Sequence, residues 1–109
     1  MDYDPPDRVS PLTAEGEYVL LEAAAVKLNL RIRLERLQDD DDLPSSRGGL
    51  IRLGRDWIVI LDKRAPIQER VGVLARALNR IVEERGQEVG YLPPAVRDII
   101  ARTKERKSH

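Results

Sequence analysis

The chain has 109 residues, and its nineteen basic residues balance its nineteen acidic ones, so its net charge gives no general attraction to nucleic acid or to an anionic membrane. With 41% hydrophobic residues it can form one domain around a single core, and its composition excludes disorder. The absence of cysteine excludes disulfides and thiolate metal sites.

From their pattern, the N-terminal residues are not expected to form a targeting signal. The stretch MDYDPPDRVSPL lacks the basic start and apolar run of a signal peptide, and no apolar stretch approaches the roughly 20 residues that cross a bilayer. Three prolines and several charges predict a flexible arm over residues 1–11. We therefore expect a cytoplasmic protein of a bacterial cell, without membrane contact.

Residues 12 to 28 are predicted to form the first helix. Apolar residues return at helical spacing, and glutamates near the start suit the positive end of the helix dipole. Ser10 or Thr13 would cap this helix, and Asn29 is a suitable left-handed residue at its end. The apolar positions are Leu20, Leu21, Ala24, Ala25 and Leu28.

Three strands are predicted next. LRIRLERL, from residue 30, alternates strictly, which is typical of a half-buried strand with one face in water. GLIRL and WIVIL flank Gly54-Arg55-Asp56, and two such runs around a short turn predict a hairpin. Because WIVIL is apolar at every position, we expect its strand to be central and covered on both faces.

The remaining residues predict two helices. Pro66 suits the first turn of a central helix, and Gly86 suits its end. A short final helix follows Pro93-Pro94, and RTKERKSH is expected to fray into solvent. The fold class is therefore α+β: a small three-stranded sheet packed with an N-terminal, a central and a short C-terminal helix, forming one domain over residues 12–102 with a flexible basic tail at 103–109. The apolar stripe of the central helix comprises Ile67, Val71, Leu74, Leu78, Ile81 and Val82, and the buried side of the final helix comprises Val96, Ile99 and Ile100.

This order of elements, with the segment GGLIRLGRDWIVILDKRAPIQERVGVLARALNRIV, resembles the ImmA/IrrE-type zinc metallopeptidase domain over roughly residues 14 to 85. In that family a hairpin strand ends in a turn that contains Asn or Asp, and a helix with the HExxH motif begins a few residues later. Leu61-Asp62-Lys63-Arg64 would take the place of the turn, and residues 67–82 that of the helix. The resemblance implies a zincin-like core.

The HExxH motif itself is absent. In the register set by the apolar stripe, Ala75 takes the place of the first metal-binding His, Arg76 that of the general-base Glu and Asn79 that of the second His. Catalytic zinc usually has three protein ligands, and an arginine can neither ligate a cation nor accept a proton. The only histidine is His109, the last residue. We therefore expect no metal, no cofactor and no catalytic residue.

Two features leave alternatives open. The run Asp39–Asp42 could gather a cation in a metal-dependent hydrolase with carboxylate ligands, although the spacing of an EF-hand is missing and a solvated loop is the simpler interpretation. The C-terminal helix, with Arg97 and Arg102, could contact phosphates in a nucleic-acid-associated factor. Asp98 and Glu105 interrupt this basic run, and no aromatic residue is interleaved for base stacking, which disfavours nucleic acid.

The sequence favours a non-catalytic interaction or regulatory module, a pseudoenzyme that resembles a metallopeptidase. We expect its partner to be another protein or a second copy, and no small-molecule substrate is implied. Trp57, Tyr91 and Arg97 are the candidate partner surface. The simpler interpretation of the two aromatic residues is that they cap the rim of the core.

Overall fold

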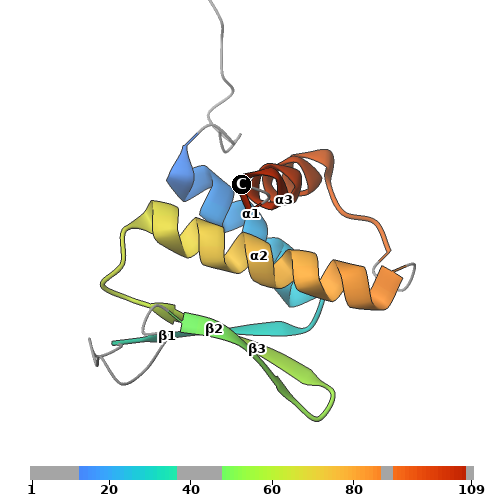
Figure 1. Ribbon diagram of the computed structural model, residues 1–109, viewed down its shortest axis with the longest axis horizontal. Coiled ribbons are helices and arrows are strands. Elements are labelled where there is room, and N and C mark those ends of the chain that lie inside the picture. Colours follow the sequence, from blue (N-terminus) through green and yellow to red (C-terminus); the bar gives the residue numbers. More distant parts are fainter. Residues whose placement is uncertain (1–12, 37–47, 87–89, 108–109) are drawn as a thin grey trace, which may run out of the picture.

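The elements of the chain follow the predicted order of helix, three strands and two helices. The computed structural model describes residues 13–36, 48–86 and 90–107, so the arm expected at 1–11 and the acidic run at 39–42 lie outside the described residues. The predicted α+β class is confirmed. The elements, drawn in Figure 1, are α1 (Ala14–Lys27), β1 (Leu30–Glu35), β2 (Gly48–Leu53), β3 (Asp56–Asp62), α2 (Ile67–Arg85) and α3 (Pro94–Lys107).

The three strands form one mixed sheet in the order β1-β3-β2. β1 lies parallel to β3, from Leu30 opposite Trp57 to Glu35 opposite Asp62, whereas β2 lies antiparallel to β3. The β2–β3 hairpin closes through a tight turn at Gly54, whose φ of +64° is a conformation that glycine adopts without steric cost. The central position predicted for WIVIL is confirmed.

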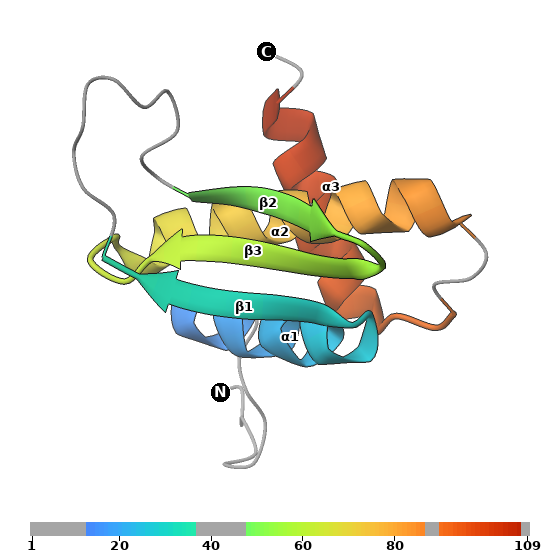
Figure 2. The ribbon, with the colours of Figure 1, turned by 90° about the horizontal axis from the view of Figure 1, so that it is seen from below.

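The helices α1, α2 and α3 all lie on the same side of the sheet (Figures 1 and 2); α1 and α2 contact the strands, and α3 packs on α1 and α2. Trp57, Val59 and Leu61 of β3 point to that side and belong to the core. The opposite side, called the open face below, has no helix over it in the described part of the chain, so the expectation that β3 is covered on both faces was wrong. The open face consists of alternate residues of each strand: Arg31, Arg33 and Glu35 of β1, Gly49, Ile51 and Leu53 of β2, and Asp56, Ile58, Ile60 and Asp62 of β3.

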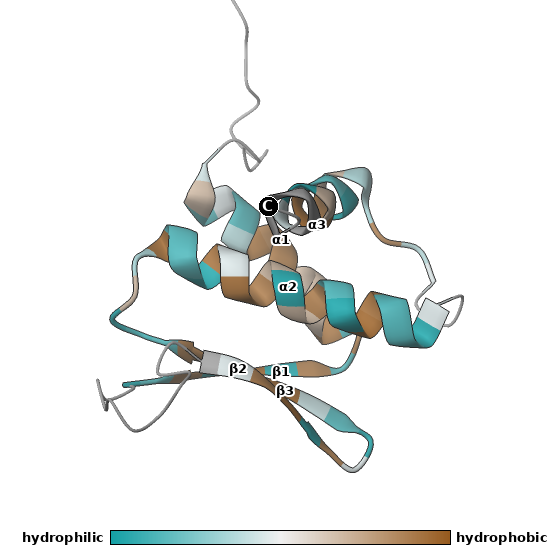
Figure 3. Ribbon diagram, viewed as in Figure 1, coloured by the Kyte–Doolittle hydropathy of each residue, from teal (hydrophilic) through white to brown (hydrophobic). Residues whose placement is uncertain are grey.

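The core lies between the sheet and α2, with α1 and α3 packed beside α2. Leu74, Leu78 and Ile81 are fully buried and belong to the apolar stripe predicted for this helix. Brown and teal bands alternate along α2 in Figure 3, as expected for an amphipathic helix. Because protein interiors are closely packed, truncating one of these side chains to alanine typically costs about 2–5 kcal/mol.

Local residues fix the ends of the helices. Thr13, one of the two caps predicted for α1, accepts a hydrogen bond on its hydroxyl from Gly16 N at 3.0 Å. Asn29 follows α1 with the positive φ expected of it, +60°, and Gly86 follows α2, as expected, with a φ of +55°. Pro66 lies immediately before α2 as its N-cap residue, not within its first turn.

The final helix is longer than predicted. α3 continues to Lys107, beyond the predicted domain boundary at residue 102, so the expected tail begins as helix. Thr103 donates a hydrogen bond from its hydroxyl to Ile99 O at 3.0 Å, and the Lys, Arg and Glu that follow are favourable helix formers. In the described ranges, no helix combines the length and apolar character needed to cross a membrane.

Candidate functional site

The three positions predicted to take the place of the HExxH motif do not share a cavity. Ala75 is fully buried in the core. Arg76 is exposed and lines a hollow of about 220 Å³ together with Asp62 and Gln68. Asn79 lines a different hollow, near the end of α2. No single ligand in either hollow would therefore meet all three positions.

Neither alternative function gains a site from the fold. Within residues 13–36, 48–86 and 90–107, no three His, Cys, Asp or Glu side chains come together in a way that could hold a metal ion. The hydrolase alternative rests on Asp39–Asp42, outside these ranges, and stays a prediction. Arg102, one of the cations of the nucleic-acid alternative, forms an ion pair with Glu17 of α1.

The candidate partner residues lie in two separate places. Trp57 is buried on the helix-covered face of β3, with the Arg52 guanidinium 5.2 Å from its ring centroid. Tyr91 and Arg97 lie together with Asn79 around a hollow of about 440 Å³. Trp57 therefore belongs to the core, and only Tyr91 and Arg97 share a surface.

Tyr91 is held in place from α1. The residue is 67% exposed, and Lys27 Nζ lies 5.4 Å from the centroid of its ring. The same Nζ donates a hydrogen bond to the carbonyl oxygen of Tyr91. A cation over an exposed ring contributes about 0.5–1 kcal/mol, so these contacts tie the connection before α3 to the end of α1.

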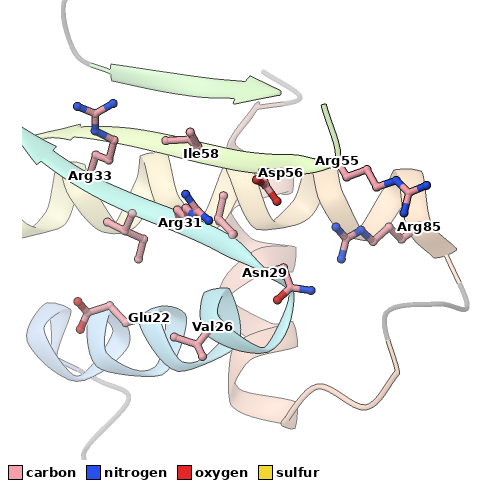
Figure 4. A pocket seen from close by; sticks show the side chains of 11 residues that line it. Glu22, Val26, Asn29, Arg31, Arg33, Arg55, Asp56, Ile58 and Arg85 are labelled. Atoms are coloured by element: carbon pink, nitrogen blue, oxygen red, sulfur yellow. The ribbon is translucent and has the colours of Figure 1, made fainter. Parts of the chain in front are cut away.

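A groove of about 1230 Å³, larger than either of these hollows, runs along β1 between the open face and α1. β1 supplies Arg31 and Arg33 to it, and the β2–β3 turn supplies Arg55. Glu22 and Val26 come from α1, and Figure 4 shows them on the side of the helix that is turned toward β1. The groove thus brings the β2–β3 turn beside α1 and β1, although this turn lies well after them in the chain.

One edge of β1 lies open along this groove. β1 is an outer strand of the sheet, with β3 as its only strand partner among the described residues, and in Figure 2 its free edge lies on the side of α1. Lys63 N donates a hydrogen bond to Glu35 O at 3.0 Å, which directs the backbone groups of the odd-numbered β1 residues toward β3. Since backbone groups alternate in direction along a strand, Ile32 and Leu34 direct their N–H and C=O groups to the free edge.

Apolar side chains flank the free edge. Leu34, near the end of β1, is 49% exposed although it shares the covered face with the buried Leu30. Val26, on α1 shortly before β1 begins, is 77% exposed. Single exposed apolar residues are common on protein surfaces, but apolar residues beside an unpaired strand are typical of a place where another chain binds.

Arginines dominate the charge of the groove. Arg55 and Arg85 lie near Asn29 at the end where β1 begins (Figure 4). Arg85 Nη1 donates a hydrogen bond to the carbonyl oxygen of Leu28 at 2.9 Å, which keeps its guanidinium beside the groove. Arg33 forms an ion pair with Glu35 of the same strand, with 2.6 Å between Nη2 and Oε2.

The sequence did not single out this groove. Val26 carried a weak signal, because it is an apolar residue outside the buried stripe of its helix. Arg55 in a turn and Arg85 in a last helical turn carried none, since such positions are ordinarily charged. No family model, no curated protein and no solved structure matches this chain. The resemblance to the ImmA/IrrE-type domain therefore stays a prediction.

Proposed function

We propose that this chain is a non-catalytic protein-interaction module that binds an extended segment of a partner protein as an additional strand along β1. The observation that carries this proposal is the free edge of β1, where Ile32 and Leu34 direct their N–H and C=O groups outward. In strand addition, main-chain hydrogen bonds give affinity, and alternate side chains give specificity. A cytoplasmic location and descent from a metallopeptidase-like domain are parts of the same proposal.

The surroundings of the edge support strand addition. Edges that must stay single are usually protected by proline or by charged residues that point inward. The strand LRIRLE contains no proline, and its charged residues all lie on the open face. An added strand would also cover the exposed side chains of Leu34 and Val26, and each Å² of apolar surface buried contributes about 25 cal/mol.

The positions that replace HExxH support the non-catalytic part of the proposal. Ala75 is buried, and Arg76 and Asn79 line separate hollows. A hydrolytic zinc site needs ligands and a general base that converge on one open coordination position. At these three positions, both the residue types and their placement depart from that arrangement.

Peptides selected from a random display library on the full chain provide the test. We expect their binding to slow the backbone amide hydrogen exchange of Ile32 and Leu34, measured by NMR, because these two N–H groups gain acceptors. The variant Leu34→Pro removes one outward N–H, and proline is tolerated where a strand N–H faces solvent. We expect it to weaken peptide binding at least about tenfold, the equivalent of one or two lost hydrogen bonds.

A matched proline at the other outer strand is the control. Leu53 lies opposite Asp56 across the hairpin turn, so the next residue, Arg52, directs its N–H away from β3. Arg52→Pro should therefore leave peptide binding unchanged. Equal weakening by both prolines, or exchange protection confined to residues around Tyr91, would remove β1 as the binding site.

A further inference from the structure

The open face of β1 is basic. Arg31 and Arg33 are both exposed there, and the only carboxylate of the strand, Glu35, pairs with Arg33. Arg31 forms no ion pair with any residue that the structure describes. A strand that pairs with β1 would therefore meet at least one arginine on this face, Arg31, that has no ion-pair partner among the described residues.

The rest of the groove has the same sign. Arg55 and Arg85 add two further guanidinium groups, against the carboxylates of Glu22 and Asp56. Arg55, like Arg31, has no ion pair among the described residues. The groove thus holds four arginines and two carboxylates, whereas the whole chain is neutral. A binding site of this charge favours a negatively charged occupant.

We infer that the segment bound along β1 is acidic, with carboxylates at alternate positions and apolar residues between them; this inference rests on the proposed function. In a paired strand, residues on one face lie directly opposite residues of the neighbour, with about 4.5–5.5 Å between Cβ atoms. Carboxylates on the open side would thus meet Arg31 and Arg33. The residues between them would point toward Leu34 and Val26, which favour apolar side chains.

A phosphate backbone is the other anion that such a face could attract. Single-stranded nucleic acid is usually held by aromatic rings that stack on the bases as well as by cations. The open face carries no aromatic residue in the described strands: Trp57 points to the helices, and Tyr18 and Tyr91 lie on or after the helices. This composition of the open face favours an acidic peptide.

Three blocked peptides separate pattern from charge: VDVDVDVD, its uncharged counterpart VNVNVNVN, and VVVVDDDD, which has the composition of the first in blocks. By fluorescence anisotropy with the full chain at low salt, we expect VDVDVDVD to bind about tenfold more tightly than either of the others, since two or three exposed ion pairs of modest strength account for such a ratio. Its affinity should fall as salt is added.

Charge reversal provides the second measurement. In the double variant Arg31→Glu/Arg33→Glu we expect the preference to invert, so that VKVKVKVK binds more tightly than VDVDVDVD. Arg97→Glu, which changes an exposed arginine in the separate hollow beside Tyr91, should keep the wild-type preference. A preference for VDVDVDVD over VKVKVKVK that survives the double reversal would overturn the inference. Wild type and Arg97→Glu provide the reference preference, so this comparison can be made even if one of the variants is poorly folded.

The outcomes distinguish this inference from the proposed function. Equal binding of VDVDVDVD and VNVNVNVN, lost in Leu34→Pro, would leave strand addition in place and remove the acidic preference. Equal binding of the alternating and the block peptide would mean attraction without strand pairing, which removes both. Tighter binding of an oligothymidylate than of VDVDVDVD, with shifts of β1 resonances, would replace the acidic peptide by nucleic acid.

Discussion

Replacing Ala75 with histidine tests whether α2 has the geometry of a metal-binding helix. The side chain of Ala75 is fully buried in the core. Leu74 and Leu78 of the same helix are equally buried. An imidazole there overpacks the core, at about 1–3 kcal/mol, and buries ring nitrogens without partners, at about 1–3 kcal/mol. We expect Ala75→His to lower the free energy of unfolding by about 2–6 kcal/mol, a large part of the roughly 5–15 kcal/mol typical of a domain.

Urea unfolding followed by circular dichroism measures this loss, and thermal melts should show a fall of at least about 10 °C. Arg76→His is the matched control, because the neighbouring side chain is exposed and should tolerate histidine within about 0.5 kcal/mol. Zinc should not raise the Tm of Ala75→His/Asn79→His. A stable Ala75→His, together with a zinc-dependent rise of Tm in the double variant, would show that these positions open to a metal site and would refute the reasoning.

Four further predictions concern stability. The Tyr18 hydroxyl is buried without a hydrogen-bond partner among the described residues, so Tyr18→Phe should leave the free energy of unfolding unchanged or raise it by up to about 1 kcal/mol in urea titrations. Burial first, and then the Glu22 carboxylate, raise the pKa of Tyr18 above 10.0, with Arg70 acting in the opposite direction. The folded state therefore holds this proton more tightly than the unfolded state. The stability that this difference contributes is present below pH 10 and is lost above it in wild type but not in Tyr18→Phe. A series of melts at rising pH will show the difference. Thr13→Ala removes the cap of α1 and should cost about 1 kcal/mol by urea unfolding, whereas Leu78→Ala, in the fully buried stripe of α2, should cost about 2–5 kcal/mol.

The elements could be predicted because their signals are local. The alternation of LRIRLE depends only on neighbouring residues, and β1 does divide into a covered and an open face. The same holds for the cap at Thr13 and for Asn29 and Gly86, which have positive φ, since each satisfies backbone groups of its own helix end. The end of α3 was misplaced because the charged run after residue 102 was interpreted as tail, although these residue types favour helix.

The layer arrangement could not be predicted in this way. WIVIL is apolar on both sides, and nothing in the pattern states that the helices pack on the side of Trp57, Val59 and Leu61 only. Ile58, on the open face, is nevertheless only 8% exposed. Ile51 lies opposite it on β2 and Arg31 on β1, so neighbouring side chains of the same face shield it in place of a helix.

The groove could not be predicted either, because it depends on the strand order. β3 lies between β2 and β1, which leaves the other edge of β1 free beside α1. A strand that alternates as LRIRLE does has the same pattern whether it is central or outermost, so its sequence does not reveal a free edge. The Arg55 and Arg85 side chains reach the groove only because the hairpin turn and the end of α2 meet beside the start of β1.

The arginines of β1 also bear on the choice between a second copy and another protein as partner. A second copy of β1 would bring two more arginines and a single carboxylate, Glu35, which is already paired with Arg33 of its own strand. In self-pairing, Arg31 of one copy would therefore compete with Arg33 of the other for the two Glu35 carboxylates. Solvent screens the repulsion between these arginines only in part. An acidic strand supplies one carboxylate for each arginine. Under the proposed function, the same side chains would disfavour pairing with a second copy and favour a partner of opposite charge.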